Sequence, residues 1–119
     1  MTGLNRLTLS EARDLLRKKE FTSLELTETC LSAMEEGARL NAFVHVTAEI
    51  ALDRARSADA RIATNDAPEM CGLPIGIKDL FCTKGAPSRA ASKILEGFVP
   101  EYESTVSQKL ADAGAVMIG

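Results

Sequence analysis

The chain has 119 residues, of which 45% are hydrophobic, and a formal net charge of −3. This length corresponds to about one domain. The net negative charge does not favour direct binding of nucleic acid. An RNA-bound substrate presented by a partner subunit is not excluded. The three cysteines form no CxxC pair, which indicates reduced thiols and neither a zinc site nor a disulfide framework.

Targeting and membrane signals are absent from the sequence. The N-terminus shows no charged-then-apolar signal pattern. No apolar run approaches the ~20 residues that a membrane helix requires. We therefore expect a soluble, cytoplasmic protein without a membrane partner.

Two capping-box patterns mark helix starts in the first third of the chain. One begins at Thr8 and the other at Thr22, each with a glutamate three residues later. Apolar residues recur at helical spacing behind both starts, and Gly37 is a suitable stop for the second helix. Two starts so close together predict a helical hairpin.

The middle of the chain predicts a strand followed by a helix. Residues 42–46 (Ala-Phe-Val-His-Val) are rich in β-formers and predict the strand. Residues 47–62 show apolar side chains on one helical stripe. We interpret the remaining charges of this helix as a solvated face. They are Asp53, Arg54, Arg56, Asp59 and Arg61.

The last third predicts a strand, a long irregular stretch, a helix and a final strand. Residues 74–78 are the first strand, and residues 79–91 are irregular before one helical turn at 92–97. The helix has its cap at Ser104 and its stop at Gly114. The final strand covers four residues, 115–118. This order resembles a crossover unit, and because an apolar strand edge is rarely left uncovered, we expect the first part of a larger fold.

Lys78 is the leading candidate for chemistry. It ends the apolar run that starts at Pro74 and has Gly72 and Gly76 before it. A lysine held in a low-dielectric site loses its proton more easily, and the neutral amine is then usable as a base. The alternative is an ordinary surface charge pair with Asp79.

The other reactive side chains favour structural roles. His45, the only histidine, has no cysteine or carboxylate at ligand spacing, so the sequence does not favour a metal site or a Ser-His-Asp hydrolase. Ser88 and Ser92 are typical of serines that hold turns or cap helices. Cys71 and Cys82 fit small buried apolar positions. Neither GxGxxG nor GxxxxGK[ST] occurs, so there is no phosphate cradle.

Residues 72–79 (Gly-Leu-Pro-Ile-Gly-Ile-Lys-Asp) resemble the lysine motif of the amidase signature family. The continuation is similar to one branch of that family, the A subunits of aspartyl/glutamyl-tRNA(Asn/Gln) amidotransferases. The segments that carry this likeness are 21–26, 40–44, 80–85, 91–100 and 104–116. They follow the family's order and extend the resemblance over essentially the whole chain.

The resemblance implies an α/β fold, in which a helical hairpin precedes strands of a mixed sheet with flanking helices. Residues 1–119 would be the N-terminal portion of a single, incomplete domain of this kind. The family's catalytic set is a serine nucleophile, a second serine joined by a cis peptide, and a lysine. By resemblance Lys78 is that lysine and acts as base toward the second serine. Both serines are expected downstream, so we expect the chain alone to be inactive. Ser88 and Arg89 stand where the branch usually has two threonines.

In this branch the A subunit hydrolyses glutamine and passes ammonia to a B subunit, while a small C subunit helps to hold the two together. The resemblance implies that B converts misacylated Glu-tRNA(Gln) or Asp-tRNA(Asn) with ATP and magnesium. This chain would then bind no cofactor or metal itself. Two alternatives stay open: another amidase-signature amide hydrolase, and a truncated, inactive assembly module.

Overall fold

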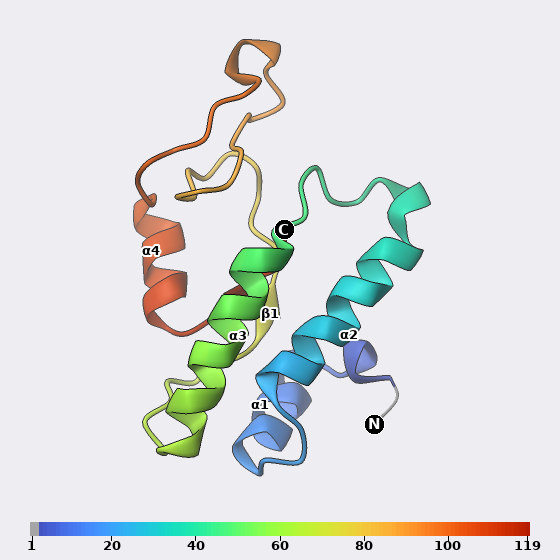
Figure 1. Cartoon of the computed structure of the whole chain (residues 1–119), viewed down its shortest axis with the longest axis vertical. Helices are drawn as coiled ribbons and strands as arrows, with labels where there is room; N and C mark the ends of the chain where they lie inside the picture. The colour runs from blue at the N-terminus through green and yellow to red at the C-terminus, as the bar shows by residue number, and fades with distance from the viewer. Residues whose placement is uncertain (1–2) are drawn as a thin grey trace.

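The computed structural model describes residues 3–119, which form four α-helices, three short 3-10 helices and two short strands (Figure 1). In chain order they are η1 (Leu4–Arg6), α1 (Leu9–Arg17), α2 (Ser23–Glu36), η2 (Ala38–Leu40), α3 (Ala48–Ala63), β1 (Pro74–Ile75), η3 (Lys93–Leu95), α4 (Thr105–Asp112) and β2 (Val116–Met117). No helix in this part of the chain has both the length and the apolar character that crossing a membrane requires.

Both predicted capping boxes are confirmed. At the start of α2, the backbone N–H of Thr22 donates to Glu25 Oε2 at 2.7 Å, and the Glu25 N–H donates to Thr22 Oγ1 at 3.1 Å. Thr8 and Glu11 make the same reciprocal pair at the start of α1. These bonds satisfy N–H groups that the first helical turn leaves without partners, so the local sequence determines where each helix begins.

β1 and β2 form a parallel pair joined through α4, as the strand-helix-strand pattern predicted. Pro74 lies opposite Val116 and Ile75 opposite Met117. The strands are shorter than predicted because only these residues share a regular ladder. Further bonds extend the contact, including one from the Ile77 N–H to the Gly119 carbonyl at 2.8 Å.

The predicted strand at residues 42–46 is wrong. These residues are exposed and belong to the loop between η2 and α3. The first bonds to the sheet come from Thr47, whose N–H donates to the Ile118 carbonyl at 3.1 Å and whose hydroxyl donates to the Met117 carbonyl at 2.9 Å. Since β-forming side chains stabilise a strand only through neighbours on a sheet, the composition alone was not sufficient.

The core lies where α2 packs along α3, and the two helices run side by side in Figure 1. Alanines at positions 51, 55 and 58 are almost completely buried on α3 and permit a close approach. One buried cluster reaches from these helices to α1 and the residues before β1, and the other reaches to β2. The two clusters hold the sheet on the α2–α3 pair.

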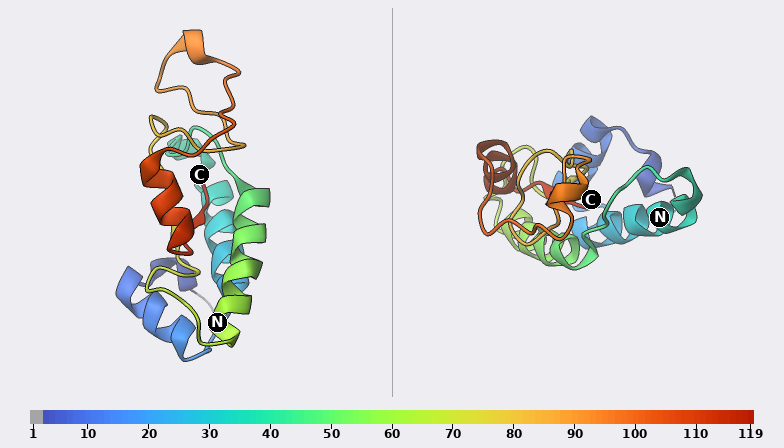
Figure 2. Two further views of the ribbon diagram at one scale, coloured as in Figure 1. Left: turned by 90° about the vertical axis from the view of Figure 1, so that its left-hand side faces the viewer. Right: turned by 90° about the horizontal axis from the view of Figure 1, so that it is seen from above.

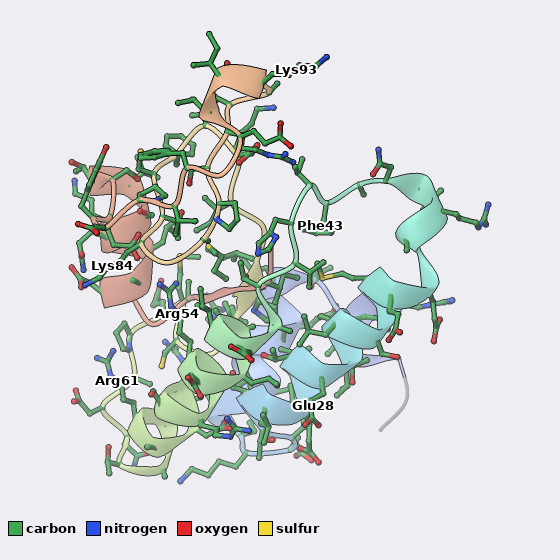
Figure 3. All side chains as sticks on the ribbon, turned by 45° about the horizontal axis from the view of Figure 1, so that its top comes forward. Glu28, Phe43, Arg54, Arg61, Lys84 and Lys93 are labelled. Carbon is green, nitrogen blue, oxygen red and sulfur yellow. The ribbon has the colours of Figure 1, made fainter. Side chains whose placement is uncertain are left out.

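The interpretation of the α3 charges as a solvated face is wrong for two of them. Asp59 is half-buried and accepts the N–H groups of Ser23 and Leu24 at 2.7 and 3.1 Å. Arg54 is also half-buried and pairs with Glu103 at 3.4 Å. Figure 3 shows Arg54 on the side of α3 that faces α4. Sequence periodicity could not reveal these partners because they lie more than thirty positions away along the chain.

Residues 79–103, which we call the excursion, leave the sheet after β1 and return at α4. In Figure 2 the excursion projects beyond the rest of the molecule, with η3 at its tip. Its two arms are tied by backbone bonds. These run from Ser104 N to Cys82 O at 2.7 Å, Gly85 N to Pro100 O at 3.1 Å and Ser88 N to Phe98 O at 3.1 Å.

Candidate active site

An open hollow of about 940 Å³ lies beyond the carboxyl end of β1. One wall is the loop before α3, the second is the start of the excursion, and the floor includes Met117 and Gly119. In sheets with parallel strands, ligands usually bind outside the carboxyl ends of the strands. This position therefore makes the hollow the candidate active site.

Lys78 lies on the wall of this hollow, three residues after β1. The bond from Ile77 to Gly119 and a second from the Phe81 N–H to the Lys78 carbonyl at 3.0 Å fix its backbone. Its side chain is exposed, so residues 3–119 do not by themselves supply the low-dielectric surroundings expected from the sequence. What they supply is the placement of the amine at the edge of a large hollow.

Asp79 is not the surface partner of Lys78 that the alternative interpretation required. Its carboxylate Oδ1 accepts the backbone N–H of Arg89 at 3.0 Å, and its carbonyl accepts that of Ala90 at 2.8 Å. No ion pair joins the two neighbours within residues 3–119. Asp79 therefore connects Arg89 and Ala90, which also line the hollow, to the position next to Lys78.

The two serines of the excursion differ in role. Ser88 is buried, its hydroxyl lies 3.4 Å from the Ala86 carbonyl, and its Oγ accepts the Thr83 N–H at 3.4 Å. The expectation that it holds a turn is thus confirmed. Ser92 precedes η3, but its side chain makes no capping bond, so its predicted role as a cap is wrong.

His45 and Phe43 line the opposite wall of the hollow, and Figure 3 shows Phe43 on the loop that leads into α3. His45 is exposed and lies in the loop before α3, so the strand predicted for it is wrong. No motif in the sequence marked these residues and Arg89 as parts of one site. They reach it through contacts of Thr47 with Met117 and of Arg89 with Asp79, which no local motif encodes.

The cysteines are all free. Burial raises the pKa of the Cys71 thiol and of the Cys30 thiol, which favours their unreactive protonated forms. Cys82 is only half-buried, and its sulfur lies 3.4 Å from the Tyr102 hydroxyl, a hydrogen bond that raises the pKa of Tyr102. The buried position predicted for Cys82 is therefore wrong. Across residues 3–119, no group of three or more His, Cys, Asp or Glu side chains is arranged to hold a metal.

The family model for Amidase matches residues 25–119. The chain belongs to the amidase family. Over its whole length it is 71% identical to the A subunit of glutamyl-tRNA(Gln) amidotransferase from Ruegeria sp. (strain TM1040), of which it covers 24%. It is 65% identical to the protein of the same name from Jannaschia sp. (strain CCS1), with the same coverage. The chain thus spans about a quarter of the length of these relatives.

Solved structures confirm the expected fold class. A native peptide amidase from Stenotrophomonas maltophilia superposes with a TM-score of 0.87 and 25% identity, covering 93% of this chain and 23% of that one. A vestigial protein complex linked to the origins of an s-triazine catabolic enzyme gives a TM-score of 0.89 and 28% identity, covering 95% and 25%. The chain is therefore a mostly helical α/β part of the amidase-signature fold and does not cover the whole of it.

Proposed function

We propose that residues 1–119 are the N-terminal portion of a single amidase-signature domain in a glutamine-hydrolysing amidotransferase subunit. The observation that carries the proposal is the 60–71% identity, over the whole chain, to proteins named as A subunits of glutamyl-tRNA(Gln) amidotransferase. That name favours conversion of Glu-tRNA(Gln) to Gln-tRNA(Gln), with Asp-tRNA(Asn) as a second substrate class.

In this proposal Lys78 is the catalytic base. As the neutral amine it accepts a proton from a bridging serine, which in turn takes the proton of a nucleophilic serine. The nucleophile attacks the carboxamide carbon of glutamine, ammonia leaves with the proton that the lysine had accepted, and water then hydrolyses the glutamyl ester to glutamate and free serine. The proposal places both serines in the part of the fold that this chain, which spans 24% of its relative's length, does not cover. The exposed position of Lys78 on the hollow supports this role because the amine can be reached from the side of the substrate.

The ammonia is then used by partners in protein biosynthesis. We assign the ATP- and magnesium-dependent ligase step, which activates the misacylated tRNA, to a B subunit, and the bridging of the two subunits to a C subunit. This chain's own residues bind neither ATP nor metal in the proposed reaction. Its contribution is the lysine and part of the wall around the glutamine.

The test is glutamine hydrolysis by the full-length protein with its B and C partners. We expect Lys78→Met to lower ammonia release by at least about 100-fold. Lys84→Met is the matched control, because Lys84 is also exposed but lies on the excursion and does not line the hollow. Equal activities of the two variants would contradict the role of Lys78.

A simple amide hydrolase is the second candidate, favoured by the superposition on a peptide amidase. Rapid turnover of small amides, without any effect of B and C subunits, would support it over the amidotransferase. An inactive assembly module is the third. It requires that cells contain a polypeptide near 12.8 kDa that binds a partner subunit.

A further inference from the structure

We propose that Asp79 is a positioning residue that clamps a strained turn, residues Arg89–Ser92, in the hollow beside Lys78. The catalytic consequence of this inference rests on the proposed function, because it assigns Asp79 a role in glutamine hydrolysis in addition to the base, Lys78. Its structural content can be measured without that activity.

The turn has an unfavourable sequence for its shape. The Ser92 N–H donates to the Arg89 carbonyl at 2.8 Å, and the two central residues, Ala90 and Ala91, have φ of 49° and 58°. Positive φ at both central positions is the signature of a type I′ turn, which normally takes Asn-Gly. In this conformation the Cβ of an L-residue crowds its own backbone. Two alanines therefore need contacts from elsewhere to hold the turn.

Asp79 makes those contacts. Its side chain accepts the Arg89 N–H at 3.0 Å and its carbonyl accepts the Ala90 N–H at 2.8 Å, so one residue fixes two successive amides of the turn. The carboxylate bond is the stronger kind, because its acceptor is ionised. Strained backbone conformations persist only where the surrounding structure determines them, and they gather at functional sites.

The clamp connects the turn directly to the candidate base. Asp79 is the chain neighbour of Lys78, and all four turn residues line the same hollow as Lys78. Without the carboxylate, the turn can relax to conformations with negative φ, which moves that wall relative to the amine. Because reacting groups must be held close to their productive geometry, we expect such a displacement to slow the reaction.

The test compares variants of Asp79 and of the turn in the full-length protein assembled with its partners. We expect Asp79→Ala to lower kcat/KM for glutamine by about 10- to 100-fold, measured per folded enzyme. Asp79→Asn should stay within about fivefold of the parent, because the amide oxygen still accepts the Arg89 N–H. Adding Ala90→Asn and Ala91→Gly to Asp79→Ala should recover about tenfold, because Asn-Gly favours the turn without the clamp.

Amide hydrogen exchange of the peptide spanning residues 86–95 gives the readout that does not depend on activity. Asp79→Ala should accelerate exchange there, and the Asn-Gly substitution should slow it again. Asp59→Ala is the matched control, because its carboxylate also accepts backbone N–H groups but lies away from the hollow. It should change neither the exchange of this peptide nor kcat/KM per folded enzyme.

Two results would overturn the clamp. One is parental exchange of residues 86–95 in Asp79→Ala. The other is an Asp79→Asn enzyme as impaired as Asp79→Ala with no recovery from Asn-Gly, which would indicate a role of the charge in place of the turn. A parent enzyme without glutamine hydrolysis would contradict the proposed function alone, and the exchange data would still decide on the clamp.

Discussion

The carboxylate of Asp59, in the C-terminal half of α3, accepts the backbone N–H of Ser23 at the first residue of α2, at a distance of 2.7 Å. Its second oxygen accepts the next N–H, that of Leu24, at 3.1 Å. A side chain of one helix thus satisfies the N-terminal amides of its neighbour, where the helix dipole also favours negative charge. This relationship joins the two longest helices at the edge of the core.

Replacing Asp59 should therefore destabilise the protein. We expect Asp59→Ala to lower the free energy of unfolding by about 2 kcal/mol, because charge-assisted bonds to half-buried amides are lost. Asp53→Ala on the same helix should stay within about 0.5 kcal/mol, because its ion pair with Arg56 is exposed. Urea unfolding of both variants measures the difference. Equal losses would contradict the capping role.

Two buried threonines should respond oppositely to valine. Thr27 is completely buried on α2, and its hydroxyl has no partner within residues 3–119. Thr27→Val should be neutral or stabilise the protein by up to about 1 kcal/mol, since it removes an unpaired polar group. Thr47→Val should cost about 1–2 kcal/mol, because the Met117 carbonyl loses its bond. Thermal unfolding distinguishes them, and a destabilised Thr27→Val would indicate a missing partner.

Alanine substitutions at Gly114 and Gly85 should distinguish the stability cost of backbone strain from that of steric contact. Both have positive φ, 82° and 79°, but a Cβ on Gly114 would lie 2.9 Å from Cys71, whereas one on Gly85 has nothing within 4 Å. Gly85→Ala should cost about 1 kcal/mol through the left-handed backbone alone. Gly114→Ala should cost about 3 kcal/mol or more, because Cys71 is buried and cannot move freely. Similar losses in denaturant unfolding would contradict the predicted contact.

Acid should weaken the start of α2. The Thr22 backbone N–H and hydroxyl donate to the Glu25 carboxylate and hold its pKa below the ordinary value. A lowered pKa in the folded state means that the stabilisation is present above the unfolded pKa of about 4.3 and is lost as the pH falls through the folded pKa. Glu25→Gln should therefore flatten the pH dependence of unfolding below about pH 4.3.

The control for this acid effect is Glu28→Gln. Glu28 is exposed on the same helix, and its carboxylate makes no hydrogen bond within residues 3–119. If both variants show the parental loss of stability in acid, the capping box does not contribute to it. Unfolding curves measured at a series of pH values decide the matter.

The parts of the fold that could be predicted are those encoded by neighbouring residues. Thr8, Thr22 and Ser104 each start a helix through a bond made three residues later, so the sequence alone was sufficient. The same holds for the apolar runs that pair as β1 and β2. Residues 42–46 have the composition of a strand but no neighbour on the sheet, and such partners depend on the whole fold.

For the candidate site, the sequence identified Lys78 but not its surroundings. Lys78 stands out because its glycine-flanked run is local. Asp79 looked like a simple charge beside it, since its bond to Arg89 crosses ten positions of irregular chain. His45 approaches the site only because Thr47 bonds to the end of the last strand, a contact over 70 positions. Motifs defined by the spacing of nearby residues do not extend over such separations along the chain.

The backbone bonds between the two arms of the excursion separate a fixed base from an exposed tip. Cys82 and Ser104, joined at 2.7 Å, make the base of the excursion a narrow, fixed stem between β1 and α4. Beyond these bonds, the tip carries Ile94, a residue that is 94% exposed. Changes in length or composition at the tip should therefore have little effect on the pairing of β1 with β2. Sequence changes confined to the tip, beyond the turn at residues 89–92, can therefore leave the register that places Lys78 unchanged.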